Sequence, residues 1–258
     1  MKKFVIAVFG ILTMGFYACS DDDAERIEDP TEGEAVELTY NFEAGDEGWD
    51  AGIIGIPADE EEAHGFEVNH VTAPYDENTG ALLLSASNPN NNLFIYTARH
   101  LTGLEPNTSY DISYSVQFAS VVEIDTIGVD IDTTGVGSDT TGIVNDTIDI
   151  VGNANDTINI KVGAANEELV VEETASNLLN LVGIDVGDPG VDGADLVVIG
   201  SFVADSDDSD YTLHTASTEN PVSIMTNDDG ELWLIVGAET FGSTTEIYIN
   251  NIEVTIEQ

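Results

Sequence analysis

The chain has 258 residues, of which 50 are Asp or Glu and only 5 are Lys or Arg, so its formal net charge is −45. Binding to a nucleic-acid backbone requires cations that displace the counterions of the phosphates, and this composition excludes nucleic acid as a partner. Hydrophobic residues make up 42% of the chain and there are 24 Gly, a composition typical of a folded globular protein rather than of a disordered chain.

The first residues predict export. Two lysines precede an apolar run over 4–17, which is shorter than the roughly 20 residues that a membrane-spanning helix needs. The run ends in Phe16-Tyr17-Ala18-Cys19, which resembles the lipobox of bacterial lipoproteins, where the preceding peptide is removed and the thiol is acylated. The resemblance implies a signal peptide over 1–18 and lipid attachment at Cys19, the only cysteine of the chain. Two or three acyl chains hold a protein stably on a membrane.

The segment after the cysteine is strongly acidic. Ser20-Asp21-Asp22-Asp23 resembles the signal that moves some lipoproteins of Gram-negative bacteria to the outer face of the outer membrane. From residue 20 to residue 37, 9 of 18 residues are acidic and no apolar periodicity is present. We therefore expect an acidic, solvated tether over 19–37 and an outer-membrane, lipid-anchored, surface-exposed location.

From residue 38 onward the pattern is that of β-strands. Between Tyr110 and Phe118, apolar and polar residues alternate strictly, which places five apolar side chains on one face. Similar segments, separated by turns rich in Asn, Asp, Pro and Gly, are 80–87, 93–99, 195–202, 211–215, 232–237 and 245–257. No long segment has helical periodicity. The sequence predicts one all-β domain over 38–258, an antiparallel β-sandwich.

A repetitive stretch interrupts this pattern over 121–160. Asp132-Thr133-Thr134-Gly135 recurs seven residues later, and Asn145-Asp146-Thr147-Ile148 recurs ten residues later. We expect an inserted loop rich in Asp and Thr. Its Asp-Thr pairs resemble the acceptor of a bacterial O-glycosylation system, with an unmodified slipped repeat as the open alternative. The implied glycosylated residues are Thr126, Thr133, Thr140, Thr147 and Thr157.

Three further segments resemble the opening, middle and closing signatures of carbohydrate-binding-module-like jelly rolls: Phe42–Trp49, Leu104–Tyr110 and Ile247–Val254. The run over 226–237 is similar to a family of short bacterial lipoproteins without an established role. The resemblance implies a jelly-roll sandwich and a glycan-binding function. It also implies a structural Ca²⁺ between Glu43 and residue 250, where this chain has Asn250 in place of the usual Asp. A plain turn without calcium is the alternative.

No catalytic motif is present: the chain has no Gly-x-Ser-x-Gly, no phosphate-binding Gly-rich loop and no His-Glu-x-x-His. His64 and His70 have no third zinc ligand at a fitting spacing. For stacking on sugar rings the candidates are Tyr96 and Trp233, with packing in the core as the open alternative for both.

These observations predict a surface-anchored, non-catalytic binding module for a polysaccharide or a cell-surface glycan. The alternative is an acidic, O-glycosylated coat or adhesion protein without a small-molecule ligand, favoured by the charge and the Thr repeats. A polysaccharide-active enzyme is a third hypothesis, for which no site is visible. The sequence leaves the oligomeric state open.

Overall fold

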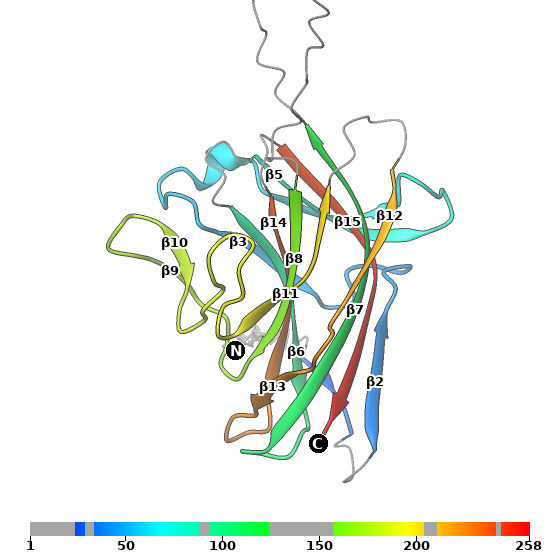
Figure 1. Cartoon of the computed structure of the whole chain (residues 1–258), viewed down its shortest axis with the longest axis vertical. Helices are drawn as coiled ribbons and strands as arrows, with labels where there is room; N and C mark the ends of the chain where they lie inside the picture. The colour runs from blue at the N-terminus through cyan, green and yellow to red at the C-terminus, as the bar shows by residue number, and fades with distance from the viewer. Residues whose placement is uncertain (1–23, 29–33, 88–92, 124–156, 204–210, 241–243) are drawn as a thin grey trace, which may run out of the picture.

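The computed structural model describes residues 24–28, 34–87, 93–123, 157–203, 211–240 and 244–258, which form two facing β-sheets (Figure 1). Sheet A contains β1 (Glu25–Arg26), β3 (Asp50–Ile54), β6 (Phe94–Thr102), β8 (Thr157–Ala165), β11 (Leu196–Val203) and β14 (Leu232–Thr240). Sheet B contains β2 (Ala35–Tyr40), β4 (Glu67–Thr72), β5 (Gly80–Ser87), β7 (Ser109–Glu123), β12 (Leu213–Ser217), β13 (Val222–Met225) and β15 (Thr244–Glu257). A separate hairpin is formed by β9 (Val171–Glu173) and β10 (Leu179–Leu181), and one 3-10 turn, η1, spans Glu61–His64.

The chain passes repeatedly between the two sheets. The order in sheet A is β1-β6-β14-β8-β11 with β3 also on β6, and the order in sheet B is β12-β7-β15-β5-β4 with β13 on β7 and β2 on β15. The pairings are antiparallel except that of β1 with β6. This arrangement confirms the predicted all-β jelly-roll sandwich. In the described part of the chain no helix is long and apolar enough to cross a membrane.

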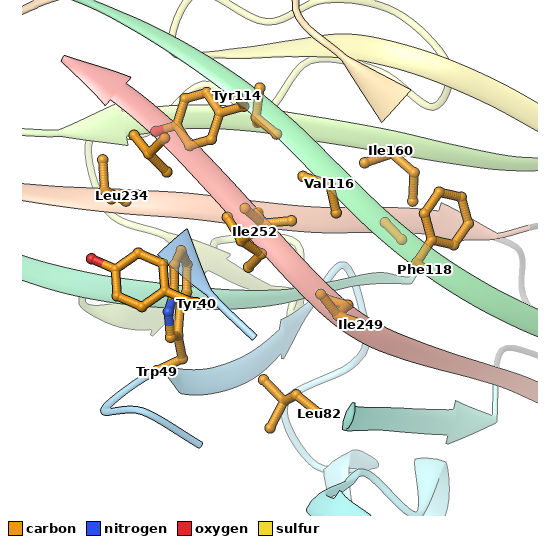
Figure 2. Packing of buried hydrophobic residues seen from close by; sticks show 14 of the residues in the cluster. Tyr40, Trp49, Leu82, Tyr114, Val116, Phe118, Ile160, Leu234, Ile249 and Ile252 are labelled. Carbon is orange, nitrogen blue, oxygen red and sulfur yellow. The ribbon is translucent and has the colours of Figure 1, made fainter. Parts of the chain in front are cut away.

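The core lies between the sheets and follows the alternation read from the sequence (Figure 2). On β7, Tyr114, Val116 and Phe118 face inward and are at most 2% exposed. The hydroxyl of Tyr114 donates a hydrogen bond of 2.6 Å to the carbonyl oxygen of Gly163 on the facing sheet. On β15 the inward positions shift at Asn250, because a β-bulge there lets Ile249 and Ile252 both point into the core.

The acidic tether is shorter than expected. Glu25–Arg26 pairs with β6, and Ile27 is only 6% exposed. The carboxylate of Glu25 accepts hydrogen bonds from the hydroxyl of Tyr40 at 2.6 Å and from Nε of Arg99 at 3.4 Å. The end of the predicted tether, from Ala35, belongs to β2. A two-residue strand with one apolar neighbour has no periodicity, so the sequence pattern could not show that this segment docks.

Both ends of the predicted insertion differ from the expectation of a loop. β7 continues to Glu123, and β8 begins at Thr157, so both ends of the range 121–160 are strand. Ile158 and Ile160 are buried in the core, because the second copy of the repeat alternates apolar and polar residues as a strand does. Thr157 is half-buried at the start of β8. Thr126, Thr133, Thr140 and Thr147 lie outside the described residues, as does Cys19.

Candidate functional site

The outer face of sheet A carries the predicted aromatic candidates. Because side chains alternate along a strand, every second residue of three neighbouring strands points away from the shared core. The register places these residues side by side: Phe94, Tyr96, Ala98 and His100 of β6, Trp233, Ile235, Gly237 and Glu239 of β14, and Asn159, Lys161, Gly163 and Ala165 of β8.

This face is covered by residues 166–195, here called the cover segment, which consists of the β9–β10 hairpin and the cover loop 182–195. The hairpin is attached to the chain after β3 by three backbone hydrogen bonds, from Gly55 N to Leu179 O at 2.9 Å, from Leu179 N to Ile56 O at 2.8 Å and from Ala58 N to Asn177 O at 3.0 Å. Apolar residues of the cover segment pack on the sheet and form a second, smaller core: Leu169, Leu181, Ile184 and Val186.

Both predicted aromatic residues are engaged in packing on this face. Tyr96 is 7% exposed and stacks on Phe94, with ring centroids 6.2 Å apart and planes at 16°. Burial raises the pKa of Tyr96, and the charge of Asp50 adds to the increase. Trp233 is half-buried and stacks on His100 at 4.2 Å and 3°. Neither Tyr96 nor Trp233 lines the cleft or the groove described below.

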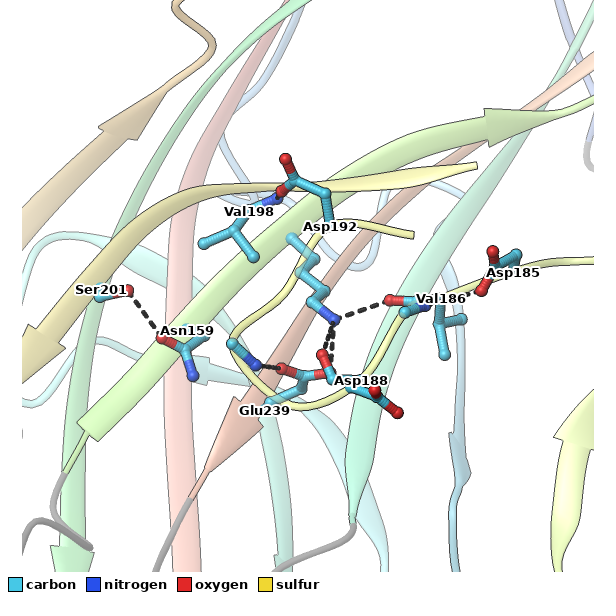
Figure 3. A network of polar contacts seen from close by, with 11 residues as sticks. Asn159, Asp185, Val186, Asp188, Asp192, Val198, Ser201 and Glu239 are labelled. Atoms are coloured by element: carbon cyan, nitrogen blue, oxygen red, sulfur yellow. Dashed lines mark hydrogen bonds and ion pairs between the residues drawn. The ribbon is translucent and has the colours of Figure 1, made fainter. Parts of the chain in front are cut away.

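The cover loop is held by a buried ion pair (Figure 3). Lys161 is 0% exposed, and its Nζ lies 2.6 Å from Oε1 of Glu239 on the neighbouring strand. The same ammonium donates to two carbonyl oxygens of the cover loop, at 2.7 Å to Val186 and 3.0 Å to Asp188. The backbone N–H of Gly190 donates to the other Glu239 oxygen at 2.6 Å. Three N–H donors of Lys161 therefore meet three oxygen acceptors.

The acidic residues of the cover loop organise its backbone. Asp185 accepts hydrogen bonds from Gly187 N at 3.0 Å and from Ala194 N at 3.1 Å. Its own N–H donates to the carboxylate of Asp195 at 2.7 Å. Gly187 has a φ of 75°, in the left-handed region that glycine adopts without strain. The Asp and Gly residues of this loop thus fix the loop conformation.

Between the hairpin, the cover loop and the sheet lies a cleft of about 420 Å³. Its walls combine an aromatic ring and aliphatic groups with carboxylates, an amide and hydroxyls. The side chains that define it are Ile54 and Phe94 from the sheet, Thr174, Ser176 and Asn180 from the hairpin, Asp188 and Pro189 from the cover loop, and Glu239 at the base.

Glu239 links the cleft to the ion pair. Burial raises the pKa of Glu239, and the nearby Asp188 adds to the increase, whereas Lys161 and the N–H of Gly190 act in the opposite direction. The sequence analysis missed this residue and Phe94. One feature of the sequence could have indicated Glu239: it follows the apolar run of β14 directly and lies on the same strand face as Trp233.

A second groove of about 470 Å³ lies at the side of the sandwich, between β11 and the turn from β12 to β13. No aromatic ring lines it. Two of its polar groups are bound to the backbone: Asp192 accepts from Val198 N at 2.7 Å, and Thr218 accepts from Tyr114 N at 3.0 Å. Unlike the hairpin cleft, this groove therefore offers no aromatic ring on which a sugar could stack.

The residues expected to hold calcium lie at the opposite sheet. Asn250 occupies the bulge of β15, and its Oδ1 is buried without a hydrogen-bond partner. Because Ile252 pairs with Tyr40, this bulge is level with the segment that follows β2, where Glu43 is exposed. The buried Oδ1 fits a cation ligand. In the described residues, however, no group of three or more His, Cys, Asp or Glu is arranged to hold a metal ion.

Phe42, next to Glu43 in the sequence, adopts an unusual backbone conformation near the expected calcium position. Phe42 is fully buried at a φ of 54°, a strained conformation for a bulky residue, and its carbonyl oxygen lies 2.7 Å from Nε2 of His70. Burial, Asp76 and Glu43 raise the pKa of Tyr75 to about 12. His64 contacts Ser87 O through Nδ1 at 2.6 Å, so His64 and His70 each have a backbone carbonyl as partner.

Comparison with known proteins gives the following. No family model matches the chain, and no curated protein matches it. Similar solved structures include the CBM22-1 xylan-binding domain of Paenibacillus barcinonensis Xyn10C, with 9% identity, a TM-score of 0.38 and coverage of 88% of this chain and 97% of that chain. The family 11 carbohydrate-binding module of Clostridium thermocellum has 12% identity, a TM-score of 0.34 and coverage of 84% and 94%. The K1 cleaved adhesin domain of Lys-gingipain from Porphyromonas gingivalis W83 has 12% identity, a TM-score of 0.32 and coverage of 85% and 97%. Values this low assign no ligand, so the function has to be inferred from the residues of the cleft.

Replacing the buried lysine tests the ion pair. In Lys161→Met, the carboxylate of Glu239 stays buried without its counterion, and we expect the free energy of unfolding to fall by about 3–5 kcal/mol. A carboxyl whose pKa is raised in the folded state binds more protons there than in the unfolded state, so stability increases as the pH falls. The deficit of Lys161→Met should therefore shrink toward acidic pH in urea denaturation.

The matched control is Lys161→Met combined with Glu239→Gln, which removes both charges and keeps the side-chain volumes. We expect this double variant to recover most of the lost stability, and its remaining difference in stability from the unchanged protein should depend little on pH. Equal stability of Lys161→Met and the unchanged protein at neutral pH would contradict the role given to the ion pair.

Proposed function

We propose that this protein is a non-catalytic glycan-binding module, attached to the outer membrane through lipid on Cys19 and exposed on the cell surface. The observation that supports the binding function is the composition of the hairpin cleft. An aromatic ring in its lining lies among carboxylate, amide and hydroxyl groups of separate segments of the chain. Such a mixture suits a sugar, which presents apolar C–H faces and a rim of hydroxyl groups.

The size of the cleft supports the same class of ligand. A volume of about 420 Å³ lies toward the lower end of the roughly 300–1,000 Å³ of small-molecule sites. Phe94 is 3% exposed, so only part of its ring reaches the ligand. Asn180 and Ser176 are exposed on the hairpin and can donate and accept hydrogen bonds with sugar hydroxyls.

The groups of the cleft also favour binding over catalysis. Most glycoside hydrolases use two carboxyl groups, one as a general acid and the other as a general base or a nucleophile. Both oxygens of Glu239 are held by protein donors, one by Lys161 and one by the N–H of Gly190. The other carboxylate of the cleft, Asp188, is exposed on the cover loop. A buried, doubly bound carboxylate beside one solvated carboxylate is a poor acid–base pair.

Binding can be measured by isothermal titration calorimetry against neutral xylans, mannans and glucans and their oligosaccharides. We expect Asn180→Ala to weaken binding about 5-fold to 10-fold, since a hydrogen bond between neutral groups contributes about 1 kcal/mol. Phe94→Leu should weaken it by a similar factor through loss of the aromatic face.

The control for this experiment is Trp233→Phe, on the same sheet face but outside the cleft. Its affinity should equal that of the unchanged protein, and all three variants should keep the melting temperature within a few degrees. Equal loss in Trp233→Phe and Asn180→Ala would place the ligand elsewhere on the face.

A second candidate function is supported by the charge. An acidic, O-glycosylated coat or adhesion protein needs only a solvated, self-repelling surface, and the chain has 50 acidic residues against 5 basic ones. The outer face of sheet B contributes to such a surface, with Glu37, Asp111, Glu253 and Glu257 all exposed. On this hypothesis the Thr residues of the repeats carry glycans, which would keep an Ile-rich segment soluble.

Intact-mass spectrometry tests both covalent modifications. Protein purified from the membranes of its native bacterium should exceed the mass of residues 19–258 by the mass of two or three acyl chains. Cys19→Ser should abolish this increment and the membrane association. A further increment in multiples of a sugar mass should disappear when Thr126, Thr133, Thr140, Thr147 and Thr157 are replaced by Ala. A mature mass equal to that of the bare polypeptide would contradict both modifications.

We further propose a structural Ca²⁺ bound with Glu43 and Asn250, where the unpartnered Oδ1 of Asn250 is the supporting observation. Calcium takes oxygen ligands, and a bound ion stabilises the folded state by mass action. At equal ionic strength, CaCl₂ should raise the melting temperature by about 3 °C more than NaCl does.

Two variants separate a specific site from general screening of the negative charge. Asn250→Ala should lose the extra effect of calcium and keep the effect of NaCl. Asn250→Asp adds a second carboxylate and should increase the calcium effect. An identical response to the two salts in all three proteins would rule the site out.

A further inference from the structure

We infer that the hairpin cleft receives the end of a neutral glycan chain and not an internal stretch of it. This inference rests on the proposed glycan-binding function and adds the class of ligand. Three observations on the cleft lead to it: a closed wall on one side, a rigid attachment of that wall, and the charge of the lining groups.

The wall is the contact between the cover segment and the sheet. A long chain lying across the outer face of sheet A would have to pass over Tyr96, Ala98 and Ile235. These residues are instead buried under the cover segment, whose Ile184 and Val186 pack against them. The cleft opens beside Phe94, at one end of this buried patch, and Val186 is part of its lining. A glycan that enters the cleft therefore meets a wall after a short distance.

The wall does not move aside easily. Lys161 holds the carbonyl groups of Val186 and Asp188, and Glu239 holds the N–H of Gly190 (Figure 3). Lifting the cover loop would leave the ammonium and the carboxylate without these partners in a site that is almost fully buried. The hairpin side is fixed as well, because Leu179 accepts a backbone hydrogen bond from Gly55 N at 2.9 Å and donates one to Ile56 O at 2.8 Å.

The volume sets the length of chain that fits. A cleft of about 420 Å³ that is closed on one side has room for about two sugar units. Ser176 and Pro189 at its border are exposed, so the rest of the glycan can leave toward solvent. A third and further unit would then make few contacts with the protein.

Charge selects among sugars. Asp188 and Glu239 line the cleft, and none of the described residues that line it is Lys, Arg or His. A uronic acid or a sulfated sugar would bring a further negative charge to this place, where no cation at the surface compensates it. Like charges brought together oppose binding and so exclude the wrong ligand. The cleft therefore favours neutral sugars.

Calorimetric titration with xylo-, manno- and gluco-oligosaccharides of one to six units tests this inference on the intact mature protein. For the series that binds, affinity should rise from one to two units and then change less than 2-fold up to six units. Oligosaccharides of uronic acids of the same length should bind at least 10-fold more weakly. Affinity that keeps rising through six units, or equal binding of the uronic acids, would overturn the inference.

Two variants complete the test. Asn180→Ala, in the cleft, should weaken binding of two-unit and six-unit ligands by the same factor. Val186→Ala trims the wall, and we expect it to improve binding of the longer ligands relative to the two-unit one. Absence of binding to every neutral series would refute the proposed function together with this inference, whereas binding that grows with chain length would refute this inference alone.

Discussion

The buried ion pair of Lys161 and Glu239 is the interaction on which the functional face depends. A charged amine at 0% exposure is stable only if its desolvation is compensated, and here three oxygen atoms at 2.6–3.0 Å surround it. Two of these oxygens belong to the cover loop, so the same contacts that compensate the buried charge also hold the loop on sheet A. The cleft exists because this loop and the β9–β10 hairpin are fixed on the sheet.

The few cations of the chain are placed where segments have to be fastened. After Lys3 the only basic residues of the sequence, histidine aside, are Arg26, Arg99 and Lys161. Arg99 binds Glu25 and so attaches β1 to β6, while Lys161 attaches the cover loop. In a chain with so many carboxylates, a buried cation always has an acidic partner available, and one cation can hold several oxygen ligands at once.

The acidic residues have two structural roles besides solubility. In the cover loop, Asp185, Asp192 and Asp195 accept hydrogen bonds from backbone N–H groups and take the place of regular secondary structure. On the outer face of sheet B, polar residues, among them Asp111 of β7 and Glu253 of β15, alternate with the buried residues and leave that face polar. A binding function on one sheet and a repelling, solvated surface on the other are therefore compatible in one molecule.

By itself, the sequence determined the fold class. The strict alternation over 110–118 predicts which side of β7 is buried, and the structure confirms it. The reason is that successive side chains of a strand point to opposite faces, so the apolar ones all face the core. The location predicted from the N-terminal residues rests on local chemistry and not on the fold, and it stays a prediction. The sequence also identified Tyr96 and Trp233 as aromatic residues on segments with two apolar faces.

Only the tertiary structure decided what lies on the second apolar face. Contacts between residues far apart in the chain decide three features of the structure. They cover Tyr96 with a distant segment, dock Ile27 beside β6, and make residues 157–160 part of a central strand. The cleft brings together Phe94, Asn180 and Glu239 from three segments, none of which carries a motif. No local sequence pattern predicts that these three residues lie together. Their proximity is determined by the register of the sheet and by the position in which Lys161 holds the cover loop.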